Sequence, residues 1–323
     1  MSILSAYQPY FLEKYHNYPQ GRYWTLIIAR QIESEAIFRT EGSGEPLNRE
    51  YVYAGKEGEE VIPRVVISKR KQTAVERRTG REVLRAFGLL KHSVTSKGET
   101  RICALNRNEP CEKCLDCMIY GFAAGGGGAQ RARVITDDAF SLHPATTIVG
   151  ARQFNALFDN STMRDDDGTA STSIGTDEYV KPGSIFLDME TLRDLTREEF
   201  VYVVGNVLRS TRYGAISSRI GKVQNRIAGI IVSDCELFSN LELTQAVFDV
   251  LRQGDEPPFP LRLETVATTA YDQSVSLAAS IPGRVGILSN DEVAQLVSEV
   301  TGIFQDEGTL RATLERASSM YPA

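Results

Sequence analysis

The 323-residue chain is predicted to be an α+β protein, built on a sheet with helices and insertions. Short strand-like runs occur between longer helical runs, without the regular strand–helix repeat of a doubly wound sheet. Apolar residues make up 42% of the chain, enough for a packed core. The apolar runs are far shorter than the roughly 20 residues that cross a membrane, and the N-terminus lacks the pattern of a signal peptide. We therefore expect a cytoplasmic protein without a membrane partner.

Periodicity and capping residues place the elements along the chain. Thr196 and Glu199 form a capping box, in which each side chain satisfies a backbone donor at a helix start. An apolar stripe follows, so a helix is expected to begin there and to end near Gly214. Ser289 and Glu292 repeat this signature ahead of a C-terminal helical stretch. The other expected elements are strands at 23–39 and 62–68, a helix at 73–90, strands at 183–191 and 226–234, a helix at 241–253 and a strand at 260–268.

Four of the five cysteines lie close together in the sequence, at Cys103, Cys111, Cys114 and Cys117. In a reducing cytosol a tight cysteine cluster favours metal binding over disulfides. Four thiolates can close a tetrahedral zinc site, which would be structural because no coordination position stays open. An iron–sulfur cluster and unligated thiols are the alternatives. Residues 91–118 are therefore interpreted as an insertion held together by a metal.

Residues 150–183 form a long polar segment that is rich in Ser, Thr, Gly and Asp. A plain loop in a compact domain is usually about 4–6 residues long. An extended hairpin arm, or a loop that orders on a partner, explains the length better. The acidic run at 165–167 lacks the alternate-ligand spacing of a calcium loop and is expected at the tip of the hairpin.

The net charge of −6 conceals a very uneven distribution. Residues 64–85 carry a net charge of +6, and residues 209–226 carry +5. Arg131 and Arg133 follow a run of four glycines, where the bare backbone can approach a polyanion closely. Tyr213 lies in the second basic run and can stack on a base. Each basic run alone can be a solvated face, and the glycines a flexible linker. Together they favour binding of a nucleic-acid backbone.

The sequence lacks the common catalytic and nucleotide-binding motifs. Its glycine-rich run has no Lys-Ser/Thr pair of a P-loop and no final Gly or Ala of the dinucleotide fingerprint. Neither G-x-S-x-G nor H-E-x-x-H occurs, and His16, His92 and His143 are scattered without a motif. We therefore identify no catalytic constellation.

Four segments, in this order, resemble the backbone subunits of type I-D CRISPR effector (Cascade) complexes, the Csc-two branch of the Cas-seven superfamily. They are VVISKRKQTAVERRTG, YGFAAGGGGAQRARVITDDAF, ARQFNALFDN through EYVKPGSIFLDMETL, and TRYGAISSRIGKV. They are similar to the family's RNA-gripping helix, its glycine-rich element, its projecting thumb hairpin and its late glycine- and arginine-rich loop. A cysteine-bound zinc insertion also fits the type I-D branch. The resemblance covers nearly the whole chain.

The resemblance implies an RNA-recognition-motif-like (ferredoxin-like) core made of 1–90, 119–149 and 184–323, with a zinc insertion at 91–118 and a thumb hairpin at 150–183. Copies of the subunit would stack head to tail along the guide RNA (crRNA) and, with other Cascade subunits, present it to a target DNA or RNA strand in antiviral defence. Each copy would contact phosphate and sugar, so that one protein serves any guide sequence. Phe158 or Met163 would be the wedge of the thumb. The expected RNA-binding residues are Lys69, Arg70, Lys71, Arg77, Arg78, Arg81, Arg131, Arg133, Arg212, Tyr213, Arg219 and Lys222.

The sequence departs from the family's RNA-cleaving relatives in type III complexes. Those relatives carry a catalytic Asp between the first strand and the gripping helix, whereas residues 1–115 of this chain contain no Asp. The corresponding loop offers Glu41, Glu45 and Glu50 instead. We therefore expect a scaffold that is not an enzyme and has no catalytic residues. Two alternatives stay open: a backbone subunit that also cleaves target RNA, and a zinc-containing RNA-binding protein unrelated to CRISPR.

Overall fold

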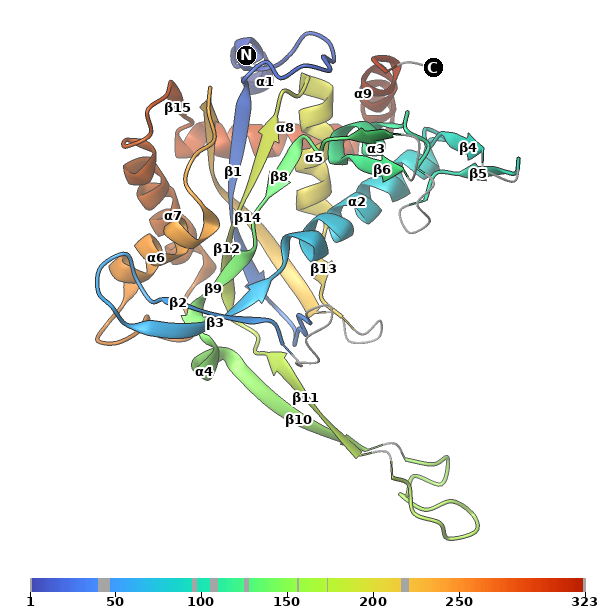
Figure 1. The fold of residues 1–323 in the computed structure, drawn as a ribbon, viewed down its shortest axis with the longest axis vertical. Helices are drawn as coiled ribbons and strands as arrows, with labels where there is room; N and C mark the ends of the chain where they lie inside the picture. The colour runs from blue at the N-terminus through green and yellow to red at the C-terminus, as the bar shows by residue number, and fades with distance from the viewer. Residues whose placement is uncertain are drawn as a thin grey trace.

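The structure, a computed structural model, describes residues 2–39, 47–94, 98–104, 110–124, 128–155, 157–172, 174–215 and 221–321. Within these residues, the centre of the molecule is a nine-stranded antiparallel sheet with helices on both faces (Figure 1). The strands follow the order β13-β14-β1-β12-β9-β3-β2, with β15 paired to β14 and β8 paired to β12. Their bounds are β1 Tyr23–Ile32, β2 Arg49–Tyr53, β3 Val61–Ile67, β8 Val134–Thr136, β9 Ala139–Pro144, β12 Ile185–Arg193, β13 Arg212–Tyr213, β14 Gly221–Ser233 and β15 Val285–Ile287. The expected mixture of helices and strands is confirmed.

Helices cover the sheet from both sides, which is why the central strand β1 is almost entirely buried. Trp24, Leu26 and Ile28 of β1 pack into the core cluster that includes α5, α8 and α9. Ile27 and Ala29 point the other way, into the cluster that includes α6 and α7. This alternation follows from the two-residue period of a strand. The helices are α1 Ile3–Ala6, α2 Lys69–Ala86, α3 Leu115–Tyr120, α4 Ala145–Ile148, α5 Arg197–Arg209, α6 Asn240–Leu251, α7 Leu263–Ala278, α8 Asn290–Gln305 and α9 Glu307–Ser319, with a 3₁₀ turn at Gln8–Tyr10.

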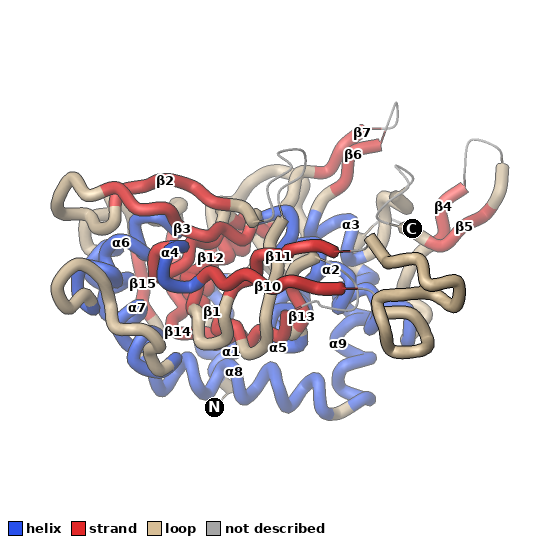
Figure 2. Tube along the Cα trace, turned by 90° about the horizontal axis from the view of Figure 1, so that it is seen from below, coloured by secondary structure: helices blue, strands red, loops and turns tan. Residues whose placement is uncertain are grey.

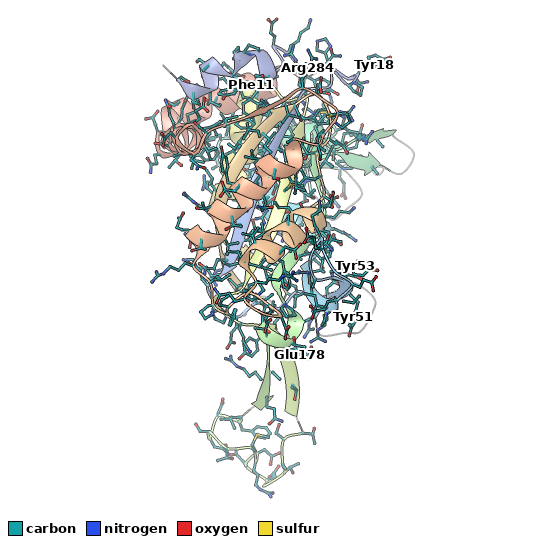
Figure 3. All side chains as sticks on the ribbon, turned by 90° about the vertical axis from the view of Figure 1, so that its left-hand side faces the viewer. Phe11, Tyr18, Tyr51, Tyr53, Glu178 and Arg284 are labelled. Atoms are coloured by element: carbon teal, nitrogen blue, oxygen red, sulfur yellow. The ribbon has the colours of Figure 1, made fainter. Side chains whose placement is uncertain are left out.

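A long hairpin, here called the arm, projects from the body (Figure 1). It consists of β10 (Val149–Asn155) paired antiparallel with β11 (Ile174–Val180), so residues 150–183 contain the expected hairpin. Three ion pairs join the base of the arm to the body: Arg152 with Glu35, Arg39 with Asp177, and Arg49 with Glu178. In Figure 3, Glu178 lies below the edge strand β2, whose Tyr51 and Tyr53 are exposed.

Two short hairpins lie beside α3 and project from the same side of the molecule (Figure 2). The first pairs β4 (His92–Val94) with β5 (Thr100–Ile102), and it precedes the cysteine-rich segment. The second pairs β6 (Phe122–Ala124) with β7 (Gly128–Gln130), on the two sides of the glycine run.

The predicted helix starts are confirmed where capping boxes were identified. Thr196 accepts from the backbone N–H of Glu199, and Ser289 accepts from that of Glu292, with the reciprocal bonds also present. The strand predicted at 260–268 is wrong, because Leu263 begins α7. Leu263, Val266, Ala267 and Ala270 are buried at helical spacing, a period that the nine-residue window was too short to reveal.

Two helix ends also differ from the prediction. Helix α5 ends at Arg209 rather than near Gly214, because β13 begins at Arg212. Helix α2 begins at Lys69, four residues before the predicted start at 73. No helix among the described residues has the length and apolar character that a membrane crossing requires.

Candidate nucleic-acid groove and metal centre

Helix α2 follows β3 almost directly, and its first turn is unusual. This turn contains three cations, Lys69, Arg70 and Lys71, and no acidic residue. Cations at a helix N-terminus oppose the helix dipole, which makes such a turn costly for folding but favourable for an anion. Asp138 compensates in part, because its carboxylate accepts from the backbone N–H of Lys69 at 2.8 Å. The first turn is therefore held in place by the turn between β8 and β9.

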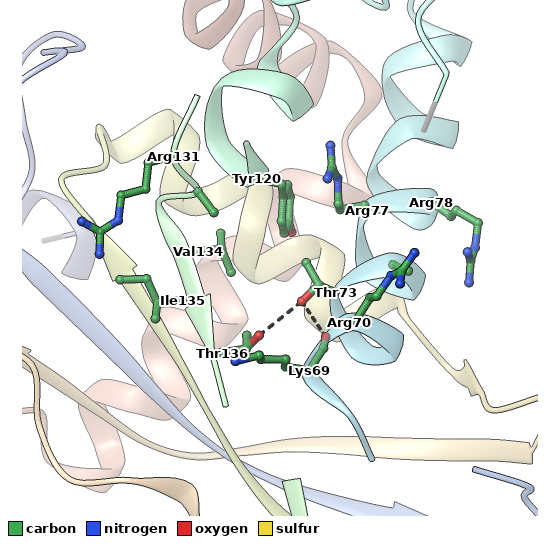
Figure 4. A pocket seen from close by; sticks show the side chains of 12 residues that line it. Lys69, Arg70, Thr73, Arg77, Arg78, Tyr120, Arg131, Val134, Ile135 and Thr136 are labelled. Atoms are coloured by element: carbon green, nitrogen blue, oxygen red, sulfur yellow. Dashed lines mark hydrogen bonds between the residues drawn. The ribbon is translucent and has the colours of Figure 1, made fainter. Parts of the chain in front are cut away.

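A groove of about 620 Å³ separates α2 from the chain that leads into β8 (Figure 4). We call it the basic groove. Tyr120 of α3 lies between its two walls, and Thr73 and Thr136 share a hydrogen bond across it at 3.3 Å. The side chains of Lys69, Arg70, Arg78 and Arg131 are exposed. The groove is lined by Lys69, Arg70, Thr73, Ala74, Arg77, Arg78, Tyr120, Arg131, Ala132, Val134, Ile135 and Thr136.

Five of the residues predicted to bind RNA thus converge on one groove: Lys69, Arg70, Arg77, Arg78 and Arg131. Lys71 lies on the same helix but does not line the groove. Arg212 and Lys222 are paired across β13 and β14 and are exposed, and Lys222 forms an ion pair with Glu33 at 3.5 Å. Arg219 lies outside the described residues.

Three predicted RNA contacts need correction, because the side chains are buried within the chain. Tyr213 is 1% exposed, so its ring cannot stack on a base in this structure; its hydroxyl accepts from Arg30 and donates to Glu76. Arg133 is buried against Glu199, the residue that completes the capping box of α5. Arg81 is buried against Asp116. The sequence shows each of these three side chains but not the buried acid that each of them contacts.

Sequence reasoning also missed a buried charge cluster beneath α2. Arg30 is fully buried and donates to Asp188, Glu190 and Glu76 at 2.6–3.0 Å. Desolvation by burial raises the pKa of Asp188 to about 6 and that of Glu190 well above its usual value. A signal was present, since Asp188 and Glu190 are two residues apart in an apolar strand and so share one face.

The four cysteines come together in a compact buried cluster, as predicted. Their sulfur atoms lie within 4.8 Å of one another. The Sγ–Sγ distances are 3.5 Å for Cys103 and Cys117, 4.0 Å for Cys111 and Cys117, and 3.9 Å for Cys103 and Cys114. A disulfide requires about 2.05 Å, so these are separate thiols. Tetrahedral thiolates at about 2.3 Å from a zinc ion would lie about 3.8 Å apart, and the observed distances bracket this value. The cluster can therefore bind a metal ion.

The surroundings of the sulfur atoms also suit thiolate ligands. The backbone N–H of Cys111 donates to Cys103 Sγ at 3.4 Å, and that of Cys114 donates to Cys111 Sγ at 3.2 Å. Hydrogen bonds from the other three cysteines lower the pKa of Cys103. At Cys114, the hydrogen bonds with the other three cysteines raise the pKa instead. Four buried thiols thus compete for a limited number of ionised states, and a cation would relieve this competition.

Comparisons with known proteins place the chain in a family. The family model described as Csc2 Crispr matches residues 10–314. This chain belongs to the Csc2 CRISPR family, which confirms its expected place among CRISPR effector proteins.

Solved structures resemble the chain along most of its length. The crystal structure of Thermofilum pendens Csc2 matches with a TM-score of 0.63 and 17% identity, over 99% of this chain and 96% of that one. A chain of a "CRISPR RNA-guided surveillance complex, pre-nicking" matches with a TM-score of 0.49 and 10% identity, over 87% of this chain and 99% of that one. The similarity to the first of these shows a shared fold. No curated protein matches the sequence closely enough to count as a relative.

Proposed function

We propose that this chain is the backbone subunit of a type I-D CRISPR effector complex and binds the guide RNA in the basic groove. The observation that carries the proposal is the convergence of Lys69, Arg70, Arg77, Arg78 and Arg131 on one groove. The described lining residues offer cations, two threonine hydroxyls and apolar surface, but no Asn, Gln or acid. Cations and hydroxyls suit phosphates and sugars, whereas reading of base edges typically uses Asn, Gln or acids as well as Arg. The groove is therefore suited to any guide sequence.

The arm supports the proposal that copies of the chain stack along the RNA. It extends away from the body, so its tip can reach a neighbouring copy in a head-to-tail array (Figure 1). Phe158 is 40% exposed, whereas Met163 is only partly exposed, so we now favour Phe158 as the wedge between guide and target strands. The ion pairs at the base of the arm would fix the direction in which the wedge is presented.

Four further parts of the proposal follow from the family. The metal is a structural zinc ion held by the four cysteines, since four protein ligands leave no position for a substrate. Strands β1, β12 and β14 with α2 and α5 would form the RNA-recognition-motif-like core. The subunit would act in the cytoplasm with other effector subunits and a target strand. We propose a non-cleaving scaffold; of the acids considered for cleavage, Glu41 and Glu45 lie outside the described residues, and Glu50 is exposed on β2.

The test is to co-express the protein with a CRISPR array and its partner subunits, and to sequence the RNA that copurifies. We expect mostly guide RNA, protected in lengths that increase by a constant step. Arg131→Ala should reduce the recovered RNA, whereas the matched control Arg284→Ala removes an exposed cation beside β15, away from α2 (Figure 1), and should not. Recovery of heterogeneous RNA would contradict the proposal and favour binding of another RNA. Equal losses of RNA in both variants would contradict binding in the basic groove.

A further inference from the structure

We infer that Asp116 couples the metal-binding segment to the basic groove, by holding Arg77 in the position from which it contacts RNA. This inference rests on the proposed function of the groove. Asp116 lies between two of the cysteines, Cys114 and Cys117, and it is fully buried. A buried carboxylate requires partners, because its desolvation is otherwise unfavourable by several kcal/mol. Its partners are the arginines of α2.

The contacts form a continuous path from the cysteines to the groove. Asp116 Oδ1 accepts from Arg77 Nε at 3.1 Å, and Oδ2 accepts from Arg77 Nη2 at 2.8 Å. Asp116 Oδ2 also accepts from Arg81 Nη1 at 2.8 Å. The same Nη1 of Arg81 lies 3.5 Å from Cys103 Sγ, and Nη2 donates to the carbonyl of Cys103. Arg81 therefore ties the carboxylate directly to one of the proposed metal ligands.

Arg77 is held by this segment on more than one side. Its Nη2 also donates to the carbonyl of Gly121 at 3.3 Å, and its guanidinium lies over the ring of Tyr120 at 5.5 Å. With Nε and Nη2 engaged, the remaining Nη1 is the group that can take a phosphate. The side chain is 18% exposed and lines the groove, so it is fixed before any RNA arrives.

The same segment also contacts the opposite wall of the groove. Gly121 has a φ of +79°, and a Cβ atom there would lie 2.6 Å from the carbonyl oxygen of Gln130 and 2.8 Å from the backbone nitrogen of Ala132. This close approach places the segment after the cysteines against the chain that carries Arg131. A metal that orders the segment would therefore order both walls.

The expected effect on affinity comes from preorganisation. Ordering one long side chain on binding weakens an interface by about two- to tenfold in Kd. Asp116→Asn keeps the size of the side chain but loses the charge-assisted bidentate contact, so Arg77 becomes mobile. The variant also loses a negative charge near the groove, which by itself would strengthen RNA binding. The two effects have opposite signs, which makes the outcome diagnostic.

The experiment measures the affinity of the full chain for a single-stranded oligouridine near 0.15 M salt. Asp116→Asn is expected to weaken binding by about two- to tenfold. Glu82→Gln is the matched control, because it removes an exposed negative charge from the same helix and should leave binding unchanged or slightly stronger. Binding by Asp116→Asn that equals or exceeds that of the parent would overturn the inference.

A second variant keeps the inference testable if Asp116→Asn does not fold. Arg77→Lys retains the charge but cannot make the bidentate contact, and it is expected to weaken binding as much as Asp116→Asn. In the Arg77→Lys background, Asp116→Asn should cause no further loss. If Arg77→Lys binds like the parent, positioning through the carboxylate is excluded.

Metal release gives an independent readout. Coupling between two sites is reciprocal in binding free energy, so oligouridine should tighten zinc binding by the protein in an equilibrium competition with a colorimetric chelator. This tightening should be lost in Arg77→Lys, whose cysteines are intact, and an equal zinc affinity with and without RNA in the parent would contradict the coupling. Arg131→Ala distinguishes a failure of the proposed groove from a failure of the coupling. If Arg131→Ala and Asp116→Asn both leave RNA binding intact, RNA does not bind in the groove. If Arg131→Ala weakens binding while Asp116→Asn does not, only the coupling is excluded.

Discussion

Replacing Glu190 with Gln is expected to stabilise the protein at neutral pH, although it removes an acid from a buried charge cluster. The guanidinium of Arg30 is surrounded by the carboxylates of Asp188, Glu76 and Glu190, all fully buried. One positive charge does not balance three negative charges in a medium of low dielectric constant. Desolvation by burial, followed by repulsion from Glu76, raises the pKa of Glu190 well above its usual value. Its Oε2 has no hydrogen-bond partner among the described residues, which fits a neutral carboxyl group.

The size of the stabilisation expected for Glu190→Gln follows from the proton that Glu190 retains in the folded state. In the unfolded chain Glu190 ionises near pH 4.5, whereas the raised pKa of Glu190 in the folded chain keeps it protonated to higher pH. Above pH 4.5 the folded state therefore binds one more proton than the unfolded state. While the folded state keeps this proton, the unfolding free energy falls as pH rises, by about 1.4 kcal/mol per pH unit. Glutamine has the shape of the neutral acid and no proton to lose, so the variant avoids this decrease.

Urea denaturation of both proteins between about pH 4.5 and pH 7 provides the assay. The difference in stability between Glu190→Gln and the parent should be close to zero at the acidic end and should increase with pH, by about 1.4 kcal/mol per pH unit while the folded parent keeps its proton. Glu315→Gln, which alters an exposed pair with Arg311, is the control and should give a small difference that is independent of pH. A difference for Glu190→Gln that does not change with pH would refute the reasoning, since it would mean that Glu190 is ionised in the folded protein.

Three further predictions concern the metal segment, the helix packing and the groove. Cys114→Ser should abolish metal binding and make residues 98–124 sensitive to limited proteolysis, with a smaller shift in the main unfolding transition. If the segment and the whole protein were destabilised equally, a role of the metal confined to this segment would be contradicted. Gly80→Ala places a Cβ atom 2.3 Å from Asn206 Nδ2 and 2.4 Å from Tyr202 OH, so urea denaturation should show a loss of about 1–3 kcal/mol. Arg131→Ala should reduce the slope of log affinity for oligouridine against log salt by about 0.7, and an unchanged slope would exclude a phosphate contact.

The sequence predicted an element of the fold correctly where the residues that determine it are neighbours in the chain. The capping boxes at Thr196 and Ser289 fixed two helix starts, because both partners of each box lie within one turn. The strand wrongly predicted at 260–268 shows the opposite case. Strand-type residues dominate this short segment, whereas burial at Leu263, Val266 and Ala270 depends on packing of α7 against a sheet that is remote in sequence.

The candidate site was predictable in its composition but not in its geometry. Charge runs identified Lys69, Arg70 and Arg131, which do line one groove. The same runs contain Arg81 and Arg133, which are neutralised by Asp116 and Glu199. An exposed arginine and a buried, paired arginine look alike in a sequence. Only the position of the partner acid, 35 or 66 residues further along the chain, distinguishes them.

Helix α2 brings these two kinds of charge together, and this arrangement explains how it can present cations in a fixed geometry. Glu76 is bound to Arg30 of the sheet, and the next residue, Arg77, is bound to Asp116 of the metal segment. The helix is thus anchored on two sides by pairs that are buried or nearly so. Salt screens exposed charges much more strongly than buried ones. High salt should therefore release RNA from the exposed cations Lys69 and Arg78 while the anchors of the helix, and with them the shape of the groove, persist.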